Sequence, residues 1–315
     1  MNHDLVTDGL LPVAQGKSGW PWAEEIPPLS DSVPDGKSRP RVSIVTPSFN
    51  QGQYLEETIR SVLLQGYPNL EYIIIDGGST DNSVEIIRKY EPWLAYWVSE
   101  PDSGQADAIN KGFSRATGEI FGWLNSDDIY NAGSLQFVGR YFIDHPDCEL
   151  LYGLGDFLDE DGNRMRPCPW IRPFDRALLL SKDFILQPAS FWRRSLWEKT
   201  GPLDVAYNWG LDWEWLIRAT SHTHPHHVQA RLGDWRITPY VKSFSANKAR
   251  RAELASISRR YGGFWQPTNL IYHADRLANW MDERFGRGRI ARIPQYPVTA
   301  LRLALRSAFD DRFLL

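Results

Sequence analysis

The sequence predicts an α/β protein built on a mostly parallel sheet with helices on both faces. Between residues 41 and 128, short β-branched apolar segments alternate four times with segments whose apolar residues recur at helical spacing. The connections between them are short, and the apolar run at residues 70–75 is unbroken, as in a strand that is buried on both faces. Such alternation is typical of parallel strands joined by helical crossovers.

Each element of this first half has a local reason. The first strand, residues 42–46, is expected to end at Pro47, because proline cannot continue a central strand. The Gly66-Tyr67-Pro68-Asn69 turn separates the first helix from the second strand. Ser79 or Thr80 can cap the second helix. The predicted strands are residues 42–46, 70–75, 93–98 and 119–124, and the predicted helices are residues 54–63, 80–90 and 106–116.

The second half is less regular. Residues 150–159, followed by the Asp161-Gly162-Asn163 turn, predict a hairpin. Further strands are predicted at residues 186–192 and 226–237, with a helix at residues 210–220 between them. Residues 246–315 predict helical pieces that glycines and a proline interrupt.

The predicted organisation has three parts. Residues 1–40, rich in Pro, Gly, Ser and Asp, form an irregular arm whose Trp20 and Trp22 dock on the body. Residues 41–245 form one domain with two halves, 41–128 and 129–245. Residues 246–315 form a helical C-terminal extension.

The composition is that of an ordinary globular protein, and it indicates in which cellular compartment the protein is expected. Only two cysteines are present, so a disulfide framework is not expected and a reducing cytoplasm fits best. We find neither an apolar run of membrane-spanning length nor a signal-peptide pattern. The 14 tryptophans suit either a core or a sugar-binding cleft, so they favour neither by themselves.

The C-terminal extension is basic, with 13 Lys and Arg against 6 Asp and Glu, whereas the rest of the chain carries 22 against 33. In its last part four apolar residues fall on one helical face: Val298, Leu301, Leu305 and Ala308. A core-packing or dimerising helix is the favoured interpretation of this face. Peripheral contact with the inner face of a membrane is the alternative.

Polar residues follow the predicted strands where a parallel sheet binds its ligands. Asp127 and Asp128 come directly after a buried strand, and two adjacent carboxylates there suit Mg²⁺ or Mn²⁺. The alternative is that one caps the helix expected near Tyr130 and the other is solvated. Asp76 ends the second strand, either as a ligand group for a base or ribose or as part of a tight turn.

Asp212 and a histidine cluster complete the candidates. Glu214 and Arg218 can pair on one face of the 210–220 helix, which leaves Asp212 without that partner. It is therefore a candidate general base, with a helix N-cap as the alternative. The cluster comprises His222, His224, His226 and His227. A surface turn is favoured over a metal site there, because Pro225 interrupts the run and no Cys or acidic ligand accompanies it.

Five ordered motifs across residues 41–245 together resemble the family 2 glycosyltransferases, which are inverting enzymes of the GT-A fold. The motifs are Val42-Ser43-Ile44-Val45-Thr46-Pro47-Ser48-Phe49-Asn50, Tyr72-Ile73-Ile74-Ile75-Asp76-Gly77-Gly78-Ser79-Thr80-Asp81, Asp107-Ala108-Ile109-Asn110-Lys111-Gly112, Asn125-Ser126-Asp127-Asp128 and the helix from Asp212 to Arg218. The resemblance implies a GT-A domain with a nucleotide-binding half (41–128) and an acceptor half (129–245).

The resemblance also implies roles for single residues. Asp212 is the implied catalytic base, and Asp127 the implied ligand of a Mn²⁺ or Mg²⁺ ion that bridges the donor diphosphate. The remaining residues implied to bind the nucleotide sugar are Thr46, Pro47, Asp76, Asp107, Asn125 and Ser126.

The implied reaction moves one sugar from a nucleotide-diphosphate sugar to a glycan or lipid-linked hydroxyl acceptor, in surface polysaccharide or glycan assembly. No nucleic-acid partner is expected. The Gln-x-x-Arg-Trp signature of processive synthases is missing, which predicts one sugar per encounter.

Three positions depart from the family pattern. Asn125 stands in place of the first Asp of the Asp-x-Asp motif, Leu211 in place of a Glu, and Thr238 where relatives often carry a His. Two other functions stay open, a nucleotidyltransferase that makes nucleotide sugars and a non-catalytic carbohydrate-binding protein. The first would need a basic Gly-rich loop after the first strand, and residues 47–52 contain no Lys or Arg.

Overall fold

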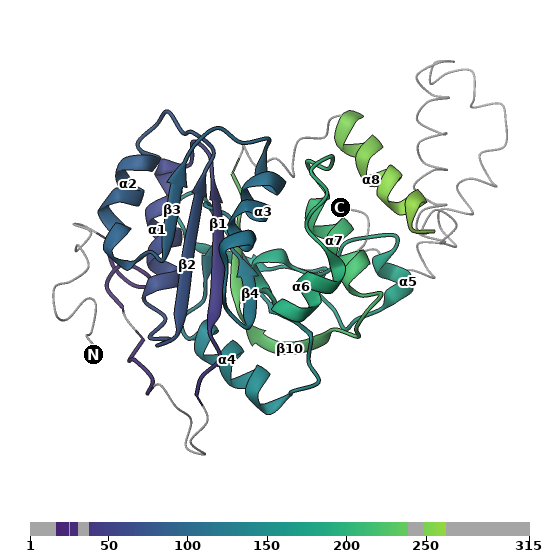
Figure 1. Ribbon diagram of the computed structural model, residues 1–315, viewed down its shortest axis with the longest axis horizontal. Coiled ribbons are helices and arrows are strands. Elements are labelled where there is room, and N and C mark those ends of the chain that lie inside the picture. Colours follow the sequence, from purple (N-terminus) through teal and green to yellow (C-terminus); the bar gives the residue numbers. More distant parts are fainter. Residues whose placement is uncertain (1–16, 25, 31–37, 239–247, 263–315) are drawn as a thin grey trace.

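The computed structural model describes residues 17–24, 26–30, 38–238 and 248–262, which fold into two sheets and the helices around them (Figure 1). The strands are β1 Val42–Ser48, β2 Leu70–Asp76, β3 Tyr96–Ser99, β4 Ile120–Trp123, β5 Ile129–Tyr130, β6 Leu150–Leu154, β7 Asp156–Leu158, β8 Arg164–Pro167, β9 Ser190–Arg193, β10 His226–Arg231 and β11 Gly233–Arg236. The α-helices are α1 Gly52–Leu63, α2 Ser83–Tyr90, α3 Gln105–Arg115, α4 Ser134–Asp144, α5 Arg176–Leu179, α6 Arg194–Thr200, α7 Leu211–Ala219 and α8 Lys248–Arg260; two 3-10 helices are η1 Glu91–Trp93 and η2 Gln187–Ala189.

The larger sheet has the strand order β10-β6-β9-β4-β1-β2-β3. Strands β3, β2, β1 and β4 run parallel, and only β9 is antiparallel to its neighbours β4 and β6. A smaller sheet, β5-β11-β7-β8, contains a hairpin of β7 and β8 around the predicted turn, but the first strand predicted at residues 150–159 divides at Gly155 into β6 of the larger sheet and β7. The predicted α/β fold with a mostly parallel sheet is confirmed.

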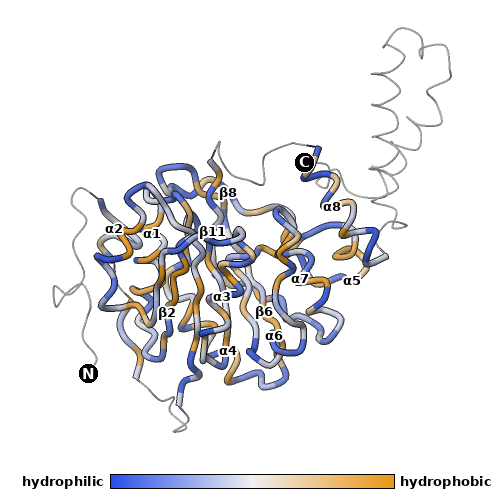
Figure 2. Tube along the Cα trace, turned by 45° about the horizontal axis from the view of Figure 1, so that its top comes forward, coloured by the Kyte–Doolittle hydropathy of each residue, from blue (hydrophilic) through white to orange (hydrophobic). Residues whose placement is uncertain are grey.

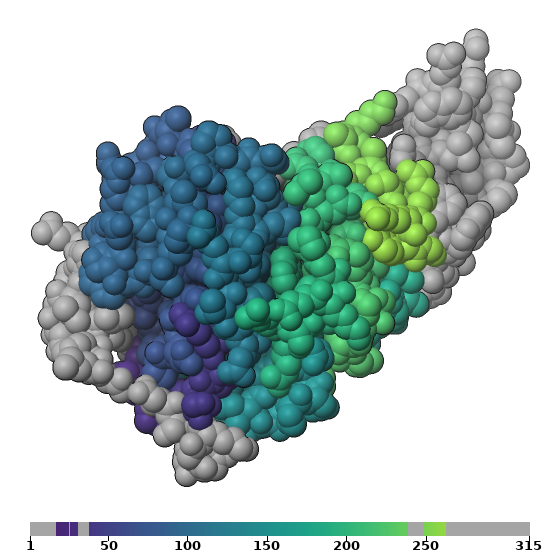
Figure 3. Space-filling view, viewed as in Figure 1, coloured from purple at the N-terminus to yellow at the C-terminus, as the bar shows by residue number. Residues whose placement is uncertain are grey.

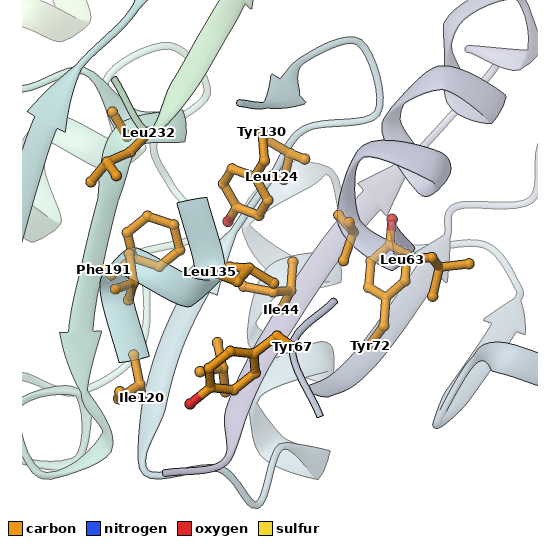
Figure 4. Close-up of a cluster of buried hydrophobic side chains, with 14 of the residues drawn as sticks. Ile44, Leu63, Tyr67, Tyr72, Ile120, Leu124, Tyr130, Leu135, Phe191 and Leu232 are labelled. Atoms are coloured by element: carbon orange, nitrogen blue, oxygen red, sulfur yellow. The ribbon is translucent and has the colours of Figure 1, made fainter. Parts of the chain in front are cut away.

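Alternate residues of the central strands serve two separate cores. Ile44 and Ile74 pack on one face, together with apolar residues of α1, α2 and α4 (Figure 4). Val45 and Ile73 point to the other face, where they pack with α3, α6 and α7. This follows from the two-residue period of a strand, and it explains why these segments are apolar throughout. Figure 2 shows the hydrophobic segments along the interior strands and the hydrophilic ones at the periphery.

Four further strand predictions were wrong at a boundary, each for a local reason. β1 does not end at Pro47 but continues to Ser48, because both residues still lie opposite β2. The third strand begins only at Tyr96, since Pro92 starts the 3-10 helix η1. The strand predicted at 186–192 begins as η2 around Pro188 and becomes β9 only at residue 190.

The fourth error concerns the strand predicted at residues 226–237. It divides at Leu232, where β10 joins the larger sheet and β11 the smaller one. Gly233 lies against the backbone of Pro188, so that a Cβ atom on residue 233 would be only 2.2 Å from the Pro188 carbonyl oxygen. The close approach lets a single segment pass from one sheet to the other.

The described part of the N-terminal arm docks on the body, as expected. The indole nitrogen of Trp20 donates a hydrogen bond to the Tyr130 carbonyl at 2.8 Å. The buried guanidinium of Arg60 donates to the carbonyls of Pro21 and Trp22 at 3.0 and 2.9 Å. These contacts place the arm against α1 and β5.

Of the C-terminal extension, the structure describes α8. The amphipathic face predicted around Val298 and Leu305 lies outside the described residues. Among the helices within them, none has the length and hydropathy to cross a membrane.

Candidate functional site

A cleft of about 640 Å³ opens at the carboxyl ends of β1, β2 and β4. Its lining comes from segments that are far apart in the sequence. They are Pro47, Ser48, Phe49 and Gln51 at the end of β1, Gly77 after β2, Pro101, Asp102, Gly104, Gln105 and Ala108 before and in α3, Trp123, Asn125, Ser126 and Asp127 at the end of β4, Asn208, Trp209, Leu211 and Asp212 at the start of α7, and Gln187, Trp235 and Thr238. This is the edge at which parallel sheets bind their ligands.

The turn that follows β4 is held from within by Asp128. One oxygen of this fully buried carboxylate accepts the backbone N–H of Arg236 at 3.0 Å. The other accepts the side-chain amide of Asn125 at 3.1 Å. Burial, followed by the charge of Asp127, raises the pKa of Asp128 well above its ordinary value. Asp128 does not cap a helix, because α4 begins only at residue 134.

Asn125 lines the cleft and connects three chain segments. Its amide nitrogen also donates to Gln187 at 3.2 Å, and its carbonyl oxygen accepts from Gln105 at 2.8 Å. An aspartate could not donate to two acceptors at this position. The amide therefore gives the turn hydrogen bonds that a carboxylate would lose.

Arg236 holds the outer part of the same turn although it lies more than 100 residues away. Its side chain is fully buried, and its Nε donates to the Asp127 carbonyl at 2.8 Å. The remaining guanidinium nitrogens donate to the carbonyls of Asp159 and Glu160 and pair with the Glu57 carboxylate at 2.8 Å. One side chain thereby joins the Asp127 turn to α1 and to the β7–β8 hairpin.

Asp127 is the carboxylate of this turn that faces the cleft. Among the described residues no side chain donates a hydrogen bond to it or forms an ion pair with it. Burial raises its pKa, an effect that its own backbone N–H and the charge of Arg236 reduce. A partly buried carboxylate with no cationic partner is available to a ligand of positive charge.

Asp212 lies in the first turn of α7 and also lines the cleft. It accepts a hydrogen bond from the backbone N–H of Trp213 at 2.8 Å and also interacts with its own backbone N–H. The predicted pair of Glu214 and Arg218 is present, with N–O distances of 2.9–3.0 Å. Burial raises the pKa of Asp212, so this carboxylate binds a proton more tightly than an exposed aspartate does.

The structure brings five of the eight predicted site residues to the cleft: Pro47, Asn125, Ser126, Asp127 and Asp212. The other three, Thr46, Asp76 and Asp107, are not among its lining residues.

These three residues instead make contacts within the fold. Asp76 is fully buried, and its oxygens accept hydrogen bonds from the backbone N–H groups of Gly78 and Ser79 and from the hydroxyls of Ser79 and Ser99. Thr46 bonds to the Tyr72 hydroxyl at 3.0 Å. Asp107 accepts from the Ser103 N–H and pairs with Lys111. They shape the loops beside the cleft.

Sequence reasoning missed several residues of the cleft. Phe49 lines it with 59% of its surface exposed, which is unusual for an aromatic side chain, and the sequence marked this residue only by its place in the first motif. Asp183 is not a lining residue but lies near Asp212, in an irregular segment where no sequence pattern marks it. Its pKa is raised well above the ordinary value by burial and by the nearby charge of Asp212.

The histidine cluster does not form a metal site. His226 contacts the Tyr141 hydroxyl, His227 stacks on Tyr152, and His224 packs edge-on against Phe174. In the part of the chain that the structure describes, no group of three His, Cys, Asp or Glu could hold a metal ion. Within these described residues, the cleft therefore offers fewer than three such side chains to a metal ion.

A cleft at the carboxyl edge of this sheet, with a carboxylate turn after β4, defines a protein of the GT-A class. The sequence model described as glycosyl transferase family 2 matches residues 43–196. An uncharacterised glycosyltransferase of Mycobacterium tuberculosis is 34% identical over 206 residues, which are 64% of this chain and 77% of that protein. The chain belongs to glycosyl transferase family 2, and it is a glycosyltransferase.

Other relatives agree. A PGL/p-HBAD biosynthesis glycosyltransferase of Mycobacterium bovis is 32% identical over 58% of this chain and 71% of its own length. Among solved structures, S. aureus TarS 1-349 in complex with UDP-GlcNAc has a TM-score of 0.59 at 15% identity, covering 85% of this chain and 80% of that one. Mannosyltransferase PcManGT from Pyrobaculum calidifontis, in complex with GDP-Man and Mn²⁺, has a TM-score of 0.55 at 19% identity, covering 89% and 90%. These two similarities concern the fold.

Proposed function

We propose that this glycosyltransferase moves one sugar, with inversion and with the help of a divalent metal, from a nucleotide-diphosphate sugar to a hydroxyl acceptor. One observation carries the proposal. The carboxylates of Asp127 and Asp212 line the same cleft from opposite halves of the domain, and neither forms an ion pair with another described residue. One is available for a cation and the other for a proton.

The donor is proposed to lie over the nucleotide-binding half. Phe49 and Pro47 offer an apolar surface to the base, and Asn125 and Ser126 offer polar groups near the ribose. TarS and PcManGT, which share this fold, have been solved in complex with UDP-GlcNAc and GDP-Man, and this supports a donor of the nucleotide-sugar class. We propose no particular sugar or nucleotide.

The donor set fits Mn²⁺ or Mg²⁺ bound largely through the substrate. Asp127 supplies one free carboxylate, whereas both oxygens of Asp128 already accept hydrogen bonds. Such ions are commonly held by one or two carboxylates together with phosphate oxygens and water. When bound, the ion supplies Lewis-acid stabilisation of the charge on the departing diphosphate.

Asp212 is proposed as the general base. It removes the proton of the acceptor hydroxyl while that oxygen forms a bond to the anomeric carbon of the sugar. The bond from this carbon to the diphosphate breaks on the opposite side, and the nucleoside diphosphate leaves with the bonding electrons. A raised pKa strengthens the base as long as the carboxylate stays ionised at the working pH.

The acceptor is proposed to enter on the side of Trp209 and Trp235, which line the cleft from the acceptor half. The M. bovis relative is a glycosyltransferase of PGL/p-HBAD biosynthesis, and this similarity supports a glycan or lipid-linked acceptor in surface polysaccharide or glycan assembly. A cytoplasmic protein with peripheral membrane contact through its C-terminal extension would meet such an acceptor. Failure of the whole chain to bind anionic liposomes would remove the membrane part of the proposal.

The direct test is to incubate the protein with a panel of nucleotide sugars, with and without Mn²⁺, and to identify the products. A glycosyltransferase releases a nucleoside diphosphate, and release should be faster with Mn²⁺. Release of pyrophosphate from a nucleoside triphosphate and a sugar phosphate would indicate a nucleotidyltransferase. Sugar binding without either product would indicate a carbohydrate-binding protein.

Substitution of Asp127 by Asn is expected to remove the stimulation by Mn²⁺ and to lower kcat/KM by about 10²-fold or more, because Lewis-acid stabilisation is worth several kcal/mol. The measurement is nucleoside diphosphate release over a Mn²⁺ titration. The control is Asp161→Asn, an exposed carboxylate in the β7–β8 turn that is not part of the cleft lining. An unchanged Mn²⁺ response in the Asp127 variant would contradict the metal assignment.

Substitution of Phe49 by Ala is expected to raise the donor KM by roughly 5- to 100-fold, since aromatic stacking on a base is worth about 1–3 kcal/mol. Thermal stability should change little, because the side chain is 59% exposed. Phe137→Ala is the matched control, an exposed phenylalanine on α4 that does not line the cleft. A similar change in KM in both variants would argue against base stacking.

A further inference from the structure

A carboxylate of the C-terminal helix α8 holds the loop that forms one wall of the cleft. Both oxygens of Glu253 accept backbone N–H groups of three consecutive residues, Asn208 at 3.0 Å, Trp209 at 2.7 Å and Gly210 at 2.8 Å. Gly210 is the N-cap residue of α7, which begins at Leu211. A carboxylate at this place also interacts favourably with the positive end of the helix dipole.

The packing around this contact is tight. A Cβ atom on Gly210 would lie 2.7 Å from the side chain of Ile257 and 2.9 Å from that of Leu254, so any larger residue there would force these side chains of α8 to shift. Ile257 is fully buried in the core that also contains Leu211 and Trp213 of α7. Figure 3 shows α8, in yellow-green, against the green segment that includes α7.

Three further contacts flank the first. Arg260 of α8 pairs with Asp204 at 3.4 Å and donates to the Tyr207 hydroxyl at 3.1 Å. The Tyr261 hydroxyl donates to Glu214 in the middle of α7. Residues of α8 and its C-terminal end therefore contact the 204–210 segment and α7 on both sides of Asp212.

The segment held in this way lines the cleft, because Asn208, Trp209, Leu211 and Asp212 are all lining residues. We propose that Glu253 is a positioning residue, whose carboxylate fixes the 208–210 wall and the first turn of α7 so that Asp212 points at the acceptor. This inference rests on the proposed function for the role of Asp212. It assigns the C-terminal extension a part in building the acceptor side of the site.

The charged groups around Asp212 determine how a substitution of Glu253 should change the pKa of Asp212. From α8, Arg250 lowers the pKa of Asp212 and Glu253 raises it. From the segment before η2, the carboxylate of Asp183 lies near Asp212, with Lys182 next to it. Loss of the Glu253 charge should therefore lower the pKa of Asp212. A side chain too short to accept the hydrogen bonds from residues 208–210 should make this segment more mobile.

Three variants of the full-length protein separate the effect of the Glu253 charge from the effect of its side-chain length. Glu253→Gln keeps the length but loses the charge, Glu253→Asp keeps the charge but is one methylene shorter, and Glu253→Ala loses both. The matched control is Arg259→Gln, which removes a charge from an exposed position of the same helix. The measurements are kcat, KM and dissociation constant for the donor, the pH profile of kcat, and hydrogen exchange of the amides at 208–212.

For Glu253→Ala and Glu253→Asp we expect kcat to fall by roughly 10- to 100-fold, since displacing a reacting group by about 1 Å can cost 10²-fold. Donor affinity should stay within about twofold, because the donor contacts lie on the other side of the cleft. Exchange at 208–210 should accelerate in both variants. In Glu253→Gln the acidic limb of the profile should move to lower pH, whereas in Glu253→Asp it should stay. Arg259→Gln should leave all of these unchanged.

The proposal is overturned if Glu253→Ala retains kcat and the exchange rates within about twofold, or if Arg259→Gln produces equal losses. Exchange and melting temperature can be measured without any substrate. If the wild-type protein turns over no donor, the proposed function fails, while faster exchange at 208–210 in the Glu253 variants would still support the positioning of the wall.

Discussion

Substitution of Asp212 by Asn is expected to lower kcat by about 10²–10⁴-fold, the usual contribution of a general base. The change preserves the shape of the side chain and removes its ability to accept the acceptor proton. Donor KM should change little, because Asp212 is not on the proposed donor side of the cleft. The measurement is the steady-state rate of sugar transfer to an acceptor, with circular dichroism to verify the fold.

The pH dependence gives an independent check of this assignment. Only the ionised carboxylate can remove a proton, and burial raises the pKa of Asp212. Activity should therefore be low at acidic pH and rise as this group loses its proton. The rise should occur at a higher pH than for an ordinary aspartate. This acidic limb should be absent from the residual activity of the Asp212 variant.

Asp183 is the informative comparison, because it is the nearby carboxylate whose charge interacts with that of Asp212. Asp183→Asn should keep most of the turnover and leave the acidic limb nearly in place, because the charge of Asp212 raises the pKa of Asp183, so Asp183 is still protonated when Asp212 ionises. If Asp183→Asn abolishes turnover and Asp212→Asn does not, the base has been assigned to the wrong residue.

Substitution of Arg236 by Gln is expected to lower the free energy of unfolding by about 3–5 kcal/mol, as when one partner of a buried ion pair is removed. The guanidinium is fully buried, and its loss would leave the Glu57 carboxylate without its 2.8 Å partner. Three backbone carbonyls would lose a donor as well. Urea denaturation followed by tryptophan fluorescence measures the effect.

The control for this experiment is Arg194→Gln. Arg194 pairs with Glu198 on the surface of α6, where both side chains are about half exposed, so its loss should cost no more than about 1 kcal/mol. A second substitution, Arg236→Lys, keeps a positive charge but cannot reproduce the planar fork that reaches all these acceptors. If Arg236→Gln and Arg194→Gln have equal effects, Arg236 does not hold the Asp127 turn.

Much of the fold could be predicted because its signals are local. The β-branched runs at residues 42–46 and 70–75, the glycine turns and the helical spacing each act within a few residues along the chain. The family could be predicted for a related reason, since five motifs in the expected order follow successive strands and helices. Errors arose where a strand changes sheets, because the close approach of Gly233 to Pro188 brings together residues that are distant in sequence.

The site was predictable in part. Residues that directly follow a strand, such as Asn125 and Asp127, reach the cleft because the end of a parallel strand determines where the next residues lie. Asp76 also ends a strand, yet the hydroxyls and amides of its own turn surround its carboxylate. Whether a side chain turns outward or inward depends on the donors nearby, and strand position alone does not determine this.

The sequence by itself determined the class of fold, the family and the position of the Asn125–Asp128 turn at the edge of the sheet. Only the tertiary structure decided which carboxylates are free. Asp128 accepts a hydrogen bond from the backbone N–H of Arg236, which follows it by 108 residues. Glu253 accepts a hydrogen bond from the N–H of Gly210 at the start of α7, and it follows Gly210 by 43 residues. Hydrogen bonds between distant segments form only once the cores are packed, and no local pattern encodes them.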